Sequence, residues 1–160
     1  MAVMAAPVTD IALVYDPVLS RCDCVFAGTD FQLDATPISA VLFSTFADRR
    51  AHADDPIADA VPDWSNPSSL VARRGWCGDF LSASNGLTGS RLWLLGRRKA
   101  TERTRKDAEG YCAEAYNWLA NSRNYAVQLT VRLISSLPVP ALGILVRVGR
   151  TTLTLQRALL

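Results

Sequence analysis

The sequence predicts an α+β fold in which a small, mostly antiparallel sheet packs against two to three helices. Two segments repeat apolar residues at helical spacing, and the last third alternates them at strand spacing. Apolar residues make up 49% of the 160 residues, which is enough to build a core. We expect one domain, 1–160, with an N-terminal arm (1–9), a long polar loop (53–71) and a C-terminal strand or tail (151–160).

The first third of the chain has the pattern of short strands. Residues 10–15, 21–27 and 29–33 are candidate strands. Asp16-Pro17 is typical of a turn after the first strand, and Gly28-Thr29 of a hairpin turn between the other two. Together these segments predict a three-stranded meander.

The first helix is indicated by its start and by its periodicity. Thr36 is a good N-cap, and Pro37 suits the first helical position because its missing N–H is not needed there. Apolar residues then recur at steps of three and four, and we expect the helix to end near Arg50 or Ala51.

Two further helices are expected after the long loop. Gly89-Ser90 precedes a short apolar helix over residues 91–95. Thr101 can cap a longer helix that runs to about Ala120, with Asn121 as a helix stop. One face of the longer helix is apolar and consists of Ala108, Tyr111, Cys112, Ala115, Tyr116 and Leu119.

The last third of the chain predicts three strands. Residues 125–134 and 142–148 alternate apolar and other side chains, and residues 137–140 (Leu-Pro-Val-Pro) connect them. After Gly149-Arg150, residues 151–155 alternate Thr and Leu, so a final strand is expected. Such a terminal strand could pair internally or could add to the sheet edge of a neighbouring chain.

Charge is divided between the two parts of the chain. Residues 1–90 contain five Arg against eleven Asp, a net charge of −6, whereas residues 91–160 have a net charge of +8. This asymmetry indicates surfaces of opposite sign, used in nucleic-acid binding or in protein assembly. No apolar run reaches the ~18 residues that cross a bilayer, and residues 1–7 do not resemble a signal peptide, so we expect synthesis and use in a cytosol.

No catalytic, cofactor or metal site is predicted. His52 is the one histidine, and we interpret it as a solvated loop residue beside Asp54 and Asp55 rather than a catalytic base. Phosphate-binding glycine motifs are absent, and the loop aspartates do not have EF-hand spacing. The cysteines lack zinc-site spacing and are expected to be reduced and packed: Cys22, Cys24, Cys77 and Cys112.

Two segments are candidate interaction surfaces. Arg73-Arg74-Gly75-Trp76 combines residue types favoured at interfaces, although Trp76 could instead fold into the core. The other is a basic run, which favours a solvated or protein-docking face over phosphate contacts because its aromatic neighbours lie on apolar helix faces. This run consists of Arg91, Arg97, Arg98, Lys99, Arg103, Arg105 and Lys106.

Several segments in a fixed order resemble the Mu-like phage baseplate wedge proteins, relatives of the sheath-initiator wedge protein of T-even phages. The resemblance covers roughly residues 10–148. It rests on Asp10-Ile-Ala-Leu13, Phe46-Ala-Asp48-Arg49-Arg50-Ala51, Arg73-Arg74-Gly75-Trp76-Cys77-Gly78-Asp79, Gly89-Ser-Arg91-Leu-Trp93-Leu-Leu95, and the helix with Ala108-Glu109-x-Tyr111 and Trp118-Leu119. Cys77 stands where the family usually has a second Trp, the 53–71 loop is longer than usual, and the Glu-Pro-Arg tripeptide of the T-even relatives is absent.

The resemblance implies a sheath-initiator fold, also described as lysozyme-like, and a non-enzymatic structural subunit of the contractile tail baseplate. Such a subunit would be an inner wedge component, six copies to a baseplate, that templates and anchors the first ring of tail sheath. Its partners would be the sheath protein and other wedge and hub proteins, with no nucleic acid, membrane or small-molecule substrate.

By the same resemblance the chain would be assembled in the host cytoplasm and reside in the virion tail. The residues expected to meet partners, or in part to brace the fold, are Arg49, Arg50, Arg73, Arg74, Trp76, Asp79, Arg97, Arg98, Arg103, Arg147, Leu153 and Leu155. Removing the residues after Arg150 is expected to leave a soluble domain that cannot template a sheath. The alternative function is a nucleic-acid-binding accessory protein that uses the basic 91–106 face.

Overall fold

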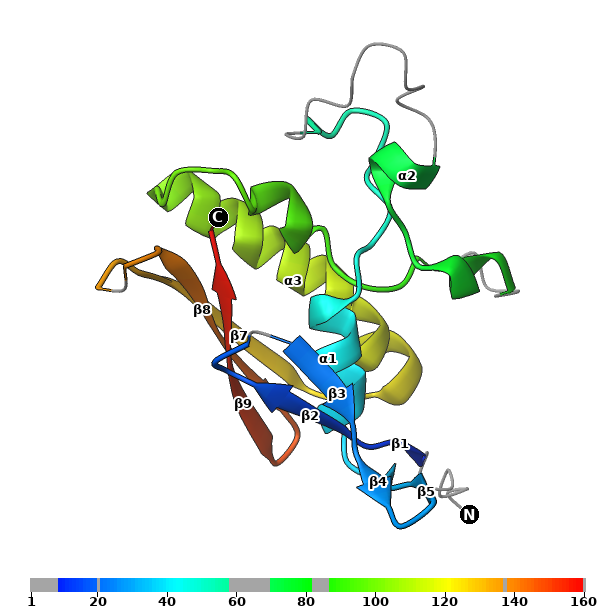
Figure 1. The fold of residues 1–160 in the computed structure, drawn as a ribbon. Coiled ribbons are helices and arrows are strands. Elements are labelled where there is room, and N and C mark those ends of the chain that lie inside the picture. The colour runs from blue at the N-terminus through cyan, green and yellow to red at the C-terminus, as the bar shows by residue number, and fades with distance from the viewer. Residues whose placement is uncertain (1–8, 20, 58–69, 82–86, 137, 160) are drawn as a thin grey trace.

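The computed structural model describes residues 9–19, 21–57, 70–81, 87–136 and 138–159, and it confirms the α+β class. An antiparallel sheet of order β7-β8-β9 lies beneath the long helix α3 (Figure 1). The elements of this body are α1 (Ile38–Phe46), α3 (Glu102–Arg123), β7 (Val127–Ile134), β8 (Ala141–Val148) and β9 (Thr151–Ala158). Among the described residues, no helix combines the length and apolar character that a membrane crossing requires.

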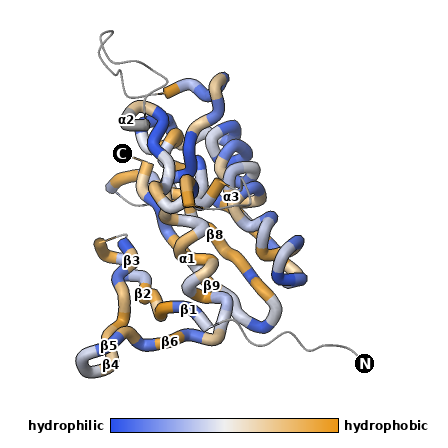
Figure 2. Tube along the Cα trace, turned by 90° about the vertical axis from the view of Figure 1, so that its right-hand side faces the viewer, coloured by the Kyte–Doolittle hydropathy of each residue, from blue (hydrophilic) through white to orange (hydrophobic). Residues whose placement is uncertain are grey.

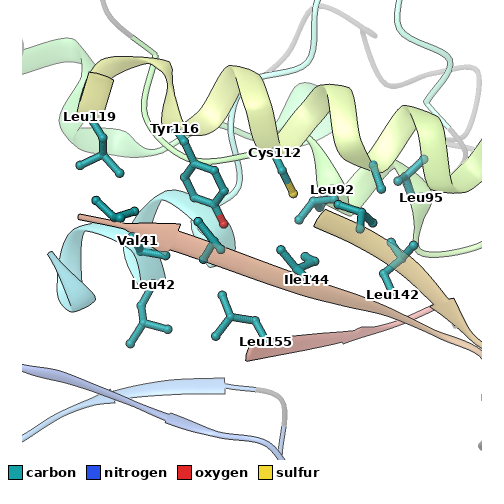
Figure 3. Close-up of a cluster of buried hydrophobic side chains, with 14 of the residues drawn as sticks. Val41, Leu42, Leu92, Leu95, Cys112, Tyr116, Leu119, Leu142, Ile144 and Leu155 are labelled. Carbon is teal, nitrogen blue, oxygen red and sulfur yellow. The ribbon is translucent and has the colours of Figure 1, made fainter. Parts of the chain in front are cut away.

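The core lies between α3, α1 and one face of this sheet (Figure 3). Ile144 of β8 is the central residue of that face, because it pairs with Val131 of β7 and with Leu155 of β9. Leu145 and Arg147 alternate with the core residues of β8 and are exposed on the opposite face. Each large apolar side chain buried in this way stabilises the fold by about 1.5–3 kcal/mol.

Helix α3 begins at the predicted cap and continues past the predicted stop. The Thr101 hydroxyl accepts a hydrogen bond from the Thr104 N–H at 3.3 Å, as its position before the apolar periodicity suggested. The prediction that Asn121 ends the helix is wrong. The helix continues to Arg123, where Asn124 adopts the left-handed conformation (φ 53°) that terminates helices.

Helix α1 is shorter than expected because a later segment captures the chain. It ends at Phe46 rather than near Arg50 or Ala51, and Ala47 is extended. The Ser90 N–H donates to the Ala47 carbonyl at 2.9 Å, and the Arg49 N–H donates to the Ser90 carbonyl at 3.0 Å. Residues 47–49 therefore run beside Ser90 as a parallel bridge instead of continuing the helix.

Short helices come before and after Ser90 in the chain. The predicted apolar helix near 91–95 is present as the 3-10 helix η2 (Leu92–Leu95), and all four of its residues are buried. Helix α2 (Leu70–Arg73) begins inside the predicted 53–71 loop, of which residues 58–69 lie outside the described residues. The 3-10 helix η1 (Cys77–Leu81) comes next.

The N-terminal strands form three separate two-stranded ladders, so the prediction of one meander is wrong. Three hydrogen bonds form a ring at the point where the ladders meet. The Ala12 N–H donates to the Gln32 carbonyl, the Val25 N–H to the Ala12 carbonyl and the Gln32 N–H to the Val25 carbonyl, at 2.8–2.9 Å. On the two sides of this ring, each chain segment pairs with a different strand. The ladders are β1 (Asp10–Ile11) with β6 (Leu33–Asp34), β2 (Leu13–Asp16) with β3 (Arg21–Cys24), and β4 (Phe26–Ala27) with β5 (Asp30–Phe31).

The last strand is part of the core. Strand β9 extends to Ala158, three residues further than predicted, and Leu155 is 2% exposed. Leu159 is also buried, and its N–H donates to the Pro140 carbonyl at 2.8 Å. Removing the residues after Arg150 would therefore open the core along β8, which contradicts the expectation that a soluble domain would remain.

Candidate partner-binding surfaces

Arg91 lies at the centre of a partly buried charge cluster instead of on a basic surface. Its Nε donates to Glu114 at 2.9 Å, and one terminal nitrogen donates to both carboxylate oxygens of Asp55 at 2.9 Å. The guanidinium also stacks on the Tyr111 ring at 4.5 Å. The side chains of Arg91 and Asp55 are only 14% and 10% exposed. Since Asp55 ends the 48–55 segment and Glu114 lies on α3, the cluster holds this segment against α3.

The contacts within the cluster also shift the pKa values of Asp55 and Arg91 toward their charged forms. Burial disfavours the charged form of Asp55, but the hydrogen bonds from Arg91 and from the His52 backbone outweigh it and hold the pKa of Asp55 below its usual value. Burial likewise opposes the charge of Arg91, yet its bonds to Asp55 and Glu114 raise the pKa of the guanidinium. The cluster is thus an ion-paired brace at neutral pH.

The arginines of the Arg-Arg-Gly-Trp segment mostly bind the chain itself. Arg73 donates to the carbonyls of His52 and Ala53, the second at 3.1 Å. Arg74 forms an ion pair with Asp48 at 2.7 Å and stacks on the Trp93 ring at 4.5 Å. Both side chains therefore brace the 48–55 segment.

Two other predicted arginines and Asp79 have the same internal role. Arg49 donates to the Leu87 carbonyl at 2.6 Å and lies 3.4 Å from Glu114. Arg50 reaches the Arg74 carbonyl at 3.5 Å. The Asp79 carboxylate accepts from the Thr88 N–H at 3.1 Å. The sequence marked these residues by type, but nothing in it distinguished a brace from a contact surface.

Trp76 is neither buried in the core nor free. The residue is 41% exposed, and its ring meets the Phe43 ring edge-on, with centroids 5.2 Å apart. The ring also lies over Gly78, where a Cβ atom would come within 2.1 Å of it. Beside it on η1, Phe80 and Leu81 are exposed. This corner is therefore an apolar surface with a fixed aromatic ring.

The basic run is divided by internal ion pairs. Arg98 pairs with Asp107 at 2.8 Å, and Arg105 pairs with both Glu102 and Glu109 at 2.7–2.9 Å. Arg97, Lys99, Arg103 and Lys106 are exposed. Since phosphate binding depends on many cations acting together, the partial neutralisation of this face favours the nucleic-acid alternative less than the bare sequence did.

The predicted residues of the last strands lie on two different faces. The side chains of Leu153 and Leu155 pack into the core, so they do not form a contact surface in this structure. Arg147 is exposed on the opposite face of the sheet, in register with Thr152. What β9 offers to a partner is therefore its backbone edge.

Tyr15 occupies part of that edge, a contact that no sequence pattern indicated. Its hydroxyl donates to the Gln156 carbonyl at 2.7 Å and accepts from the Gln156 N–H at 3.2 Å. Residues of an antiparallel strand turn their backbone groups alternately to either side, so Thr152 and Thr154 face the same open edge as Gln156. Within the described part of the chain, only Tyr15 hydrogen-bonds to this edge.

The residues considered for chemistry are dispersed. The His52 imidazole is 3.5 Å from Glu114 at the surface of the brace. Burial raises the pKa of Cys112 to about 12 and, with a smaller contribution from Asp23, that of Cys22 to about 11. Three or more potential metal ligands do not come together anywhere in the described ranges.

Comparison with known proteins shows which family this chain resembles. The family model described as "Phage protein GP46" matches residues 37–154, from the start of α1 into β9. "Baseplate protein gp46" of Escherichia phage Mu is 40% identical over 111 residues, which is 69% of this chain and 68% of the relative. "Mu-like prophage FluMu protein gp46" of Haemophilus influenzae is 29% identical over 131 residues, which is 81% of this chain and 78% of the relative.

No solved structure matches the chain. The family model covers most of the chain, including α1, α3, β7, β8 and the first half of β9, so the match concerns the body of the molecule. It confirms the resemblance to Mu-like phage baseplate proteins that the ordered sequence segments indicated. The chain belongs to the Phage protein GP46 family.

Proposed function

We propose that this chain is a structural, non-enzymatic subunit of a contractile phage tail baseplate, where it templates and anchors the first ring of tail sheath. The names of the two relatives support the baseplate role. The observation that carries the templating role is the open edge of β9 at Thr152 and Thr154. A strand from a sheath subunit would extend the β7-β8-β9 sheet there by β-strand addition.

The construction of β9 suits this role. Leu153 and Leu155 fix the strand to the core through one face, and pairing with β8 occupies one edge. The remaining edge is therefore held in a defined position before any partner arrives. A partner strand that pairs there gains backbone hydrogen bonds without ordering a new element on this chain.

The wider assembly follows from the same proposal. The subunit would lie in the inner wedge between hub and sheath, six copies to a baseplate, in a sheath-initiator fold. It would be assembled in the host cytoplasm and would act in the virion tail. Other wedge and hub chains would contact surfaces away from β9, among them the apolar corner at Trp76.

The edge is tested by substituting Thr154→Pro in a phage that carries this gene. The outward Thr154 N–H is not part of the β8–β9 ladder, so proline removes a partner's hydrogen bond without removing an internal one. We expect baseplates that contain the subunit but tails that lack sheath in electron micrographs. Thr154→Val, which changes the side chain and keeps the N–H, is the matched control and should give sheathed tails.

The proposal fails if Thr154→Pro tails carry normal sheath while the purified variant retains the folded circular dichroism spectrum. Thr152→Pro provides a second variant at the same edge, because its N–H also faces outward. Absence of the wild-type chain from purified tails would reject the baseplate role itself.

A further inference from the structure

The three N-terminal ladders, residues 10–34, expose an unusual amount of apolar surface. Figure 2 shows them at one end of the molecule, with β4 and β5 farthest from α2 and α3. Phe26 and Leu33 are each 65% exposed and Phe31 is 42% exposed. A small folded chain rarely leaves several large apolar side chains together in water unless they serve a contact.

These side chains are arranged in cross-strand pairs. Phe26 lies opposite Phe31, and their rings contact each other with centroids 4.8 Å apart. Ile11 lies opposite Leu33 in the adjoining ladder. Because cross-strand partners share one face of a ladder, the β1–β6 and β4–β5 ladders each present an apolar pair at their surface. We refer to Ile11, Phe26, Phe31 and Leu33 as the apolar pairs.

The apolar pairs are not needed to attach the ladders to the body. Leu13, Tyr15 and Cys22 of the β2–β3 ladder pack against the main core, and the Tyr15 ring stacks on Phe46 at 5.0 Å. The apolar pairs lie outside both buried clusters among the described residues. Their exposure is therefore not a by-product of core formation.

Carboxylates alternate with the apolar pairs along the same strands, so they lie on the opposite face of the two ladders: Asp10 pairs with Asp34 beside Ile11 and Leu33, and Asp30 is next to Phe31. Asp10 accepts from the Ile11 N–H at 2.8 Å, and Asp30 accepts from the Phe31 N–H at 2.7 Å. Asp34 accepts from the Thr36 N–H and hydroxyl at 2.8 Å. In the described part of the chain these three carboxylates form no ion pair, and the one cation of the ladders, Arg21, pairs with Asp23 at 3.1 Å.

The apolar pairs and the carboxylates together indicate which kind of partner binds the ladders. The apolar pairs favour a partner with an apolar groove, and the carboxylates on the other face of the same ladders favour lysine or arginine side chains that reach around the ladder edges. The same negative charge repels nucleic acid and anionic lipid surfaces. A cationic protein surface is the occupant that satisfies both the apolar and the charged part.

We infer that the N-terminal ladders are the docking element by which this subunit binds another baseplate chain, one that presents an apolar groove flanked by lysine or arginine. This inference rests on the proposed baseplate function and adds to it a second contact, separate from the β9 edge. The ladders would anchor the subunit to the baseplate, and β9 would receive the sheath.

The test uses baseplates isolated from a phage that lacks both this gene and the sheath gene, so that sheath cannot account for retention. Purified full-length chain is added, and the bound fraction is measured after sedimentation. Phe26→Ser with Phe31→Ser should weaken binding by about thirtyfold, the effect of removing an aromatic hot spot. Leu145→Ser is the control: Leu145 is 41% exposed on the outer face of β8, and its loss should change binding by less than about twofold.

A charge variant tests the docking inference without removing the apolar side chains that stabilise the β4–β5 ladder. Asp10→Asn with Asp30→Asn keeps the hydrogen-bond acceptors and removes two charges. It should weaken binding by about tenfold at low salt and reduce the salt dependence of binding. This variant remains decisive if the serine variant fails to fold.

The outcomes separate the two proposals. If the wild-type chain binds no baseplate, the proposed function fails. If the wild-type chain binds and both the Phe and the Asp variants bind equally well, the docking inference is overturned while the baseplate role stands. Normal binding together with loss of sheath in Thr154→Pro would leave the β9 proposal intact in either case.

Discussion

Gly89 is the residue on which the path of the chain after α1 depends. Its φ is +91°, and a Cβ atom there would lie 2.2 Å from the Ala47 carbonyl oxygen. The next residue, Ser90, holds the end of α1 through a hydrogen bond from its hydroxyl to the Thr45 carbonyl at 2.7 Å. A side chain at position 89 would therefore separate the two segments that stop α1 at Phe46.

Substituting Gly89→Ala should destabilise the fold by roughly 2–4 kcal/mol, because positive φ and a backbone clash act together. Gly110→Ala is the matched control. Gly110 lies within α3 with open space around it, so alanine there should stabilise by about 1 kcal/mol. Urea unfolding of both variants measures the difference, and equal stability of the two would contradict the close approach at Gly89.

Among the elements, the 48–55 segment is held in place by charged side chains rather than by regular secondary structure. It is held from one side by Arg73 and Arg74. From the other side, Arg91 binds Asp55 and Glu114 binds Arg49. Neither a helix nor a strand carries it over most of its length, so side-chain bonds replace the backbone ladder. The protonation state of Asp55 is therefore coupled to the position of this element.

Asp55→Asn should reduce stability by roughly 1.5–3 kcal/mol at pH 7, the value of a hydrogen bond to a charged group. The folded-state pKa of Asp55 is lower than its unfolded value, so the unfolded chain binds more protons near pH 4. The contribution is present above about pH 4 and is lost as pH falls through the folded pKa. Urea unfolding at a series of pH values should show the gap to wild type narrowing from pH 6 to pH 3.

Asp54→Asn is the control for this experiment, since Asp54 is exposed and forms no ion pair in the described residues. A gap between wild type and Asp55→Asn that stayed constant with pH would show that the carboxylate charge does not brace the segment.

At the scale of the whole molecule, the structure consists of a well-packed body and a lightly attached set of ladders. The body holds α1, α3 and the β7-β8-β9 sheet, and the family model begins at residue 37, after the ladders. The β1–β6 and β4–β5 ladders contain two residues in each strand and are exposed. The two proposed contact surfaces, the ladders and the edge of β9, would then differ in rigidity.

Hydrogen exchange should resolve this difference. We expect the amides of β4 and β5 to exchange at least about a hundredfold faster than those of β8, because short exposed ladders open locally while β8 opens only with the core. Mass spectrometry of the free chain would measure both regions. Binding to baseplates should slow exchange in β4 and β5, and similar protection of β4, β5 and β8 in the free chain would contradict the division.

Local patterns were sufficient for much of the body. The periodicity of α3 with its Thr101 cap, and the alternation in β7 and β8, follow from side chains that repeat with the period of the element itself. The prediction of a terminal strand was also correct, although its length was not. The ordered segments led to the family because they span many such elements in sequence.

The candidate surfaces were less predictable from residue type. Arginine is favoured both at interfaces and in internal braces, and Arg73, Arg74 and Arg91 have the second role within this chain. The sequence predicts that the exposed Phe26 and Phe31 lie in two strands, 21–27 and 29–33, and alternation does not reveal which face of a strand has a core to pack against. Exposure depends on the rest of the fold, so no local count could have found them.

Spacing along the chain predicts the α+β class and the positions of α3 and the sheet strands, because each element repeats its side chains with its own period. The family was recognised by the resemblance of several ordered segments. The folded structure was needed to find where α1 ends, which arginines bind the chain's own residues, and how Tyr15 limits the open edge of β9. Each of these rests on contacts between residues far apart in sequence. Such contacts exist only once the chain has folded, since their energy depends on distance in space.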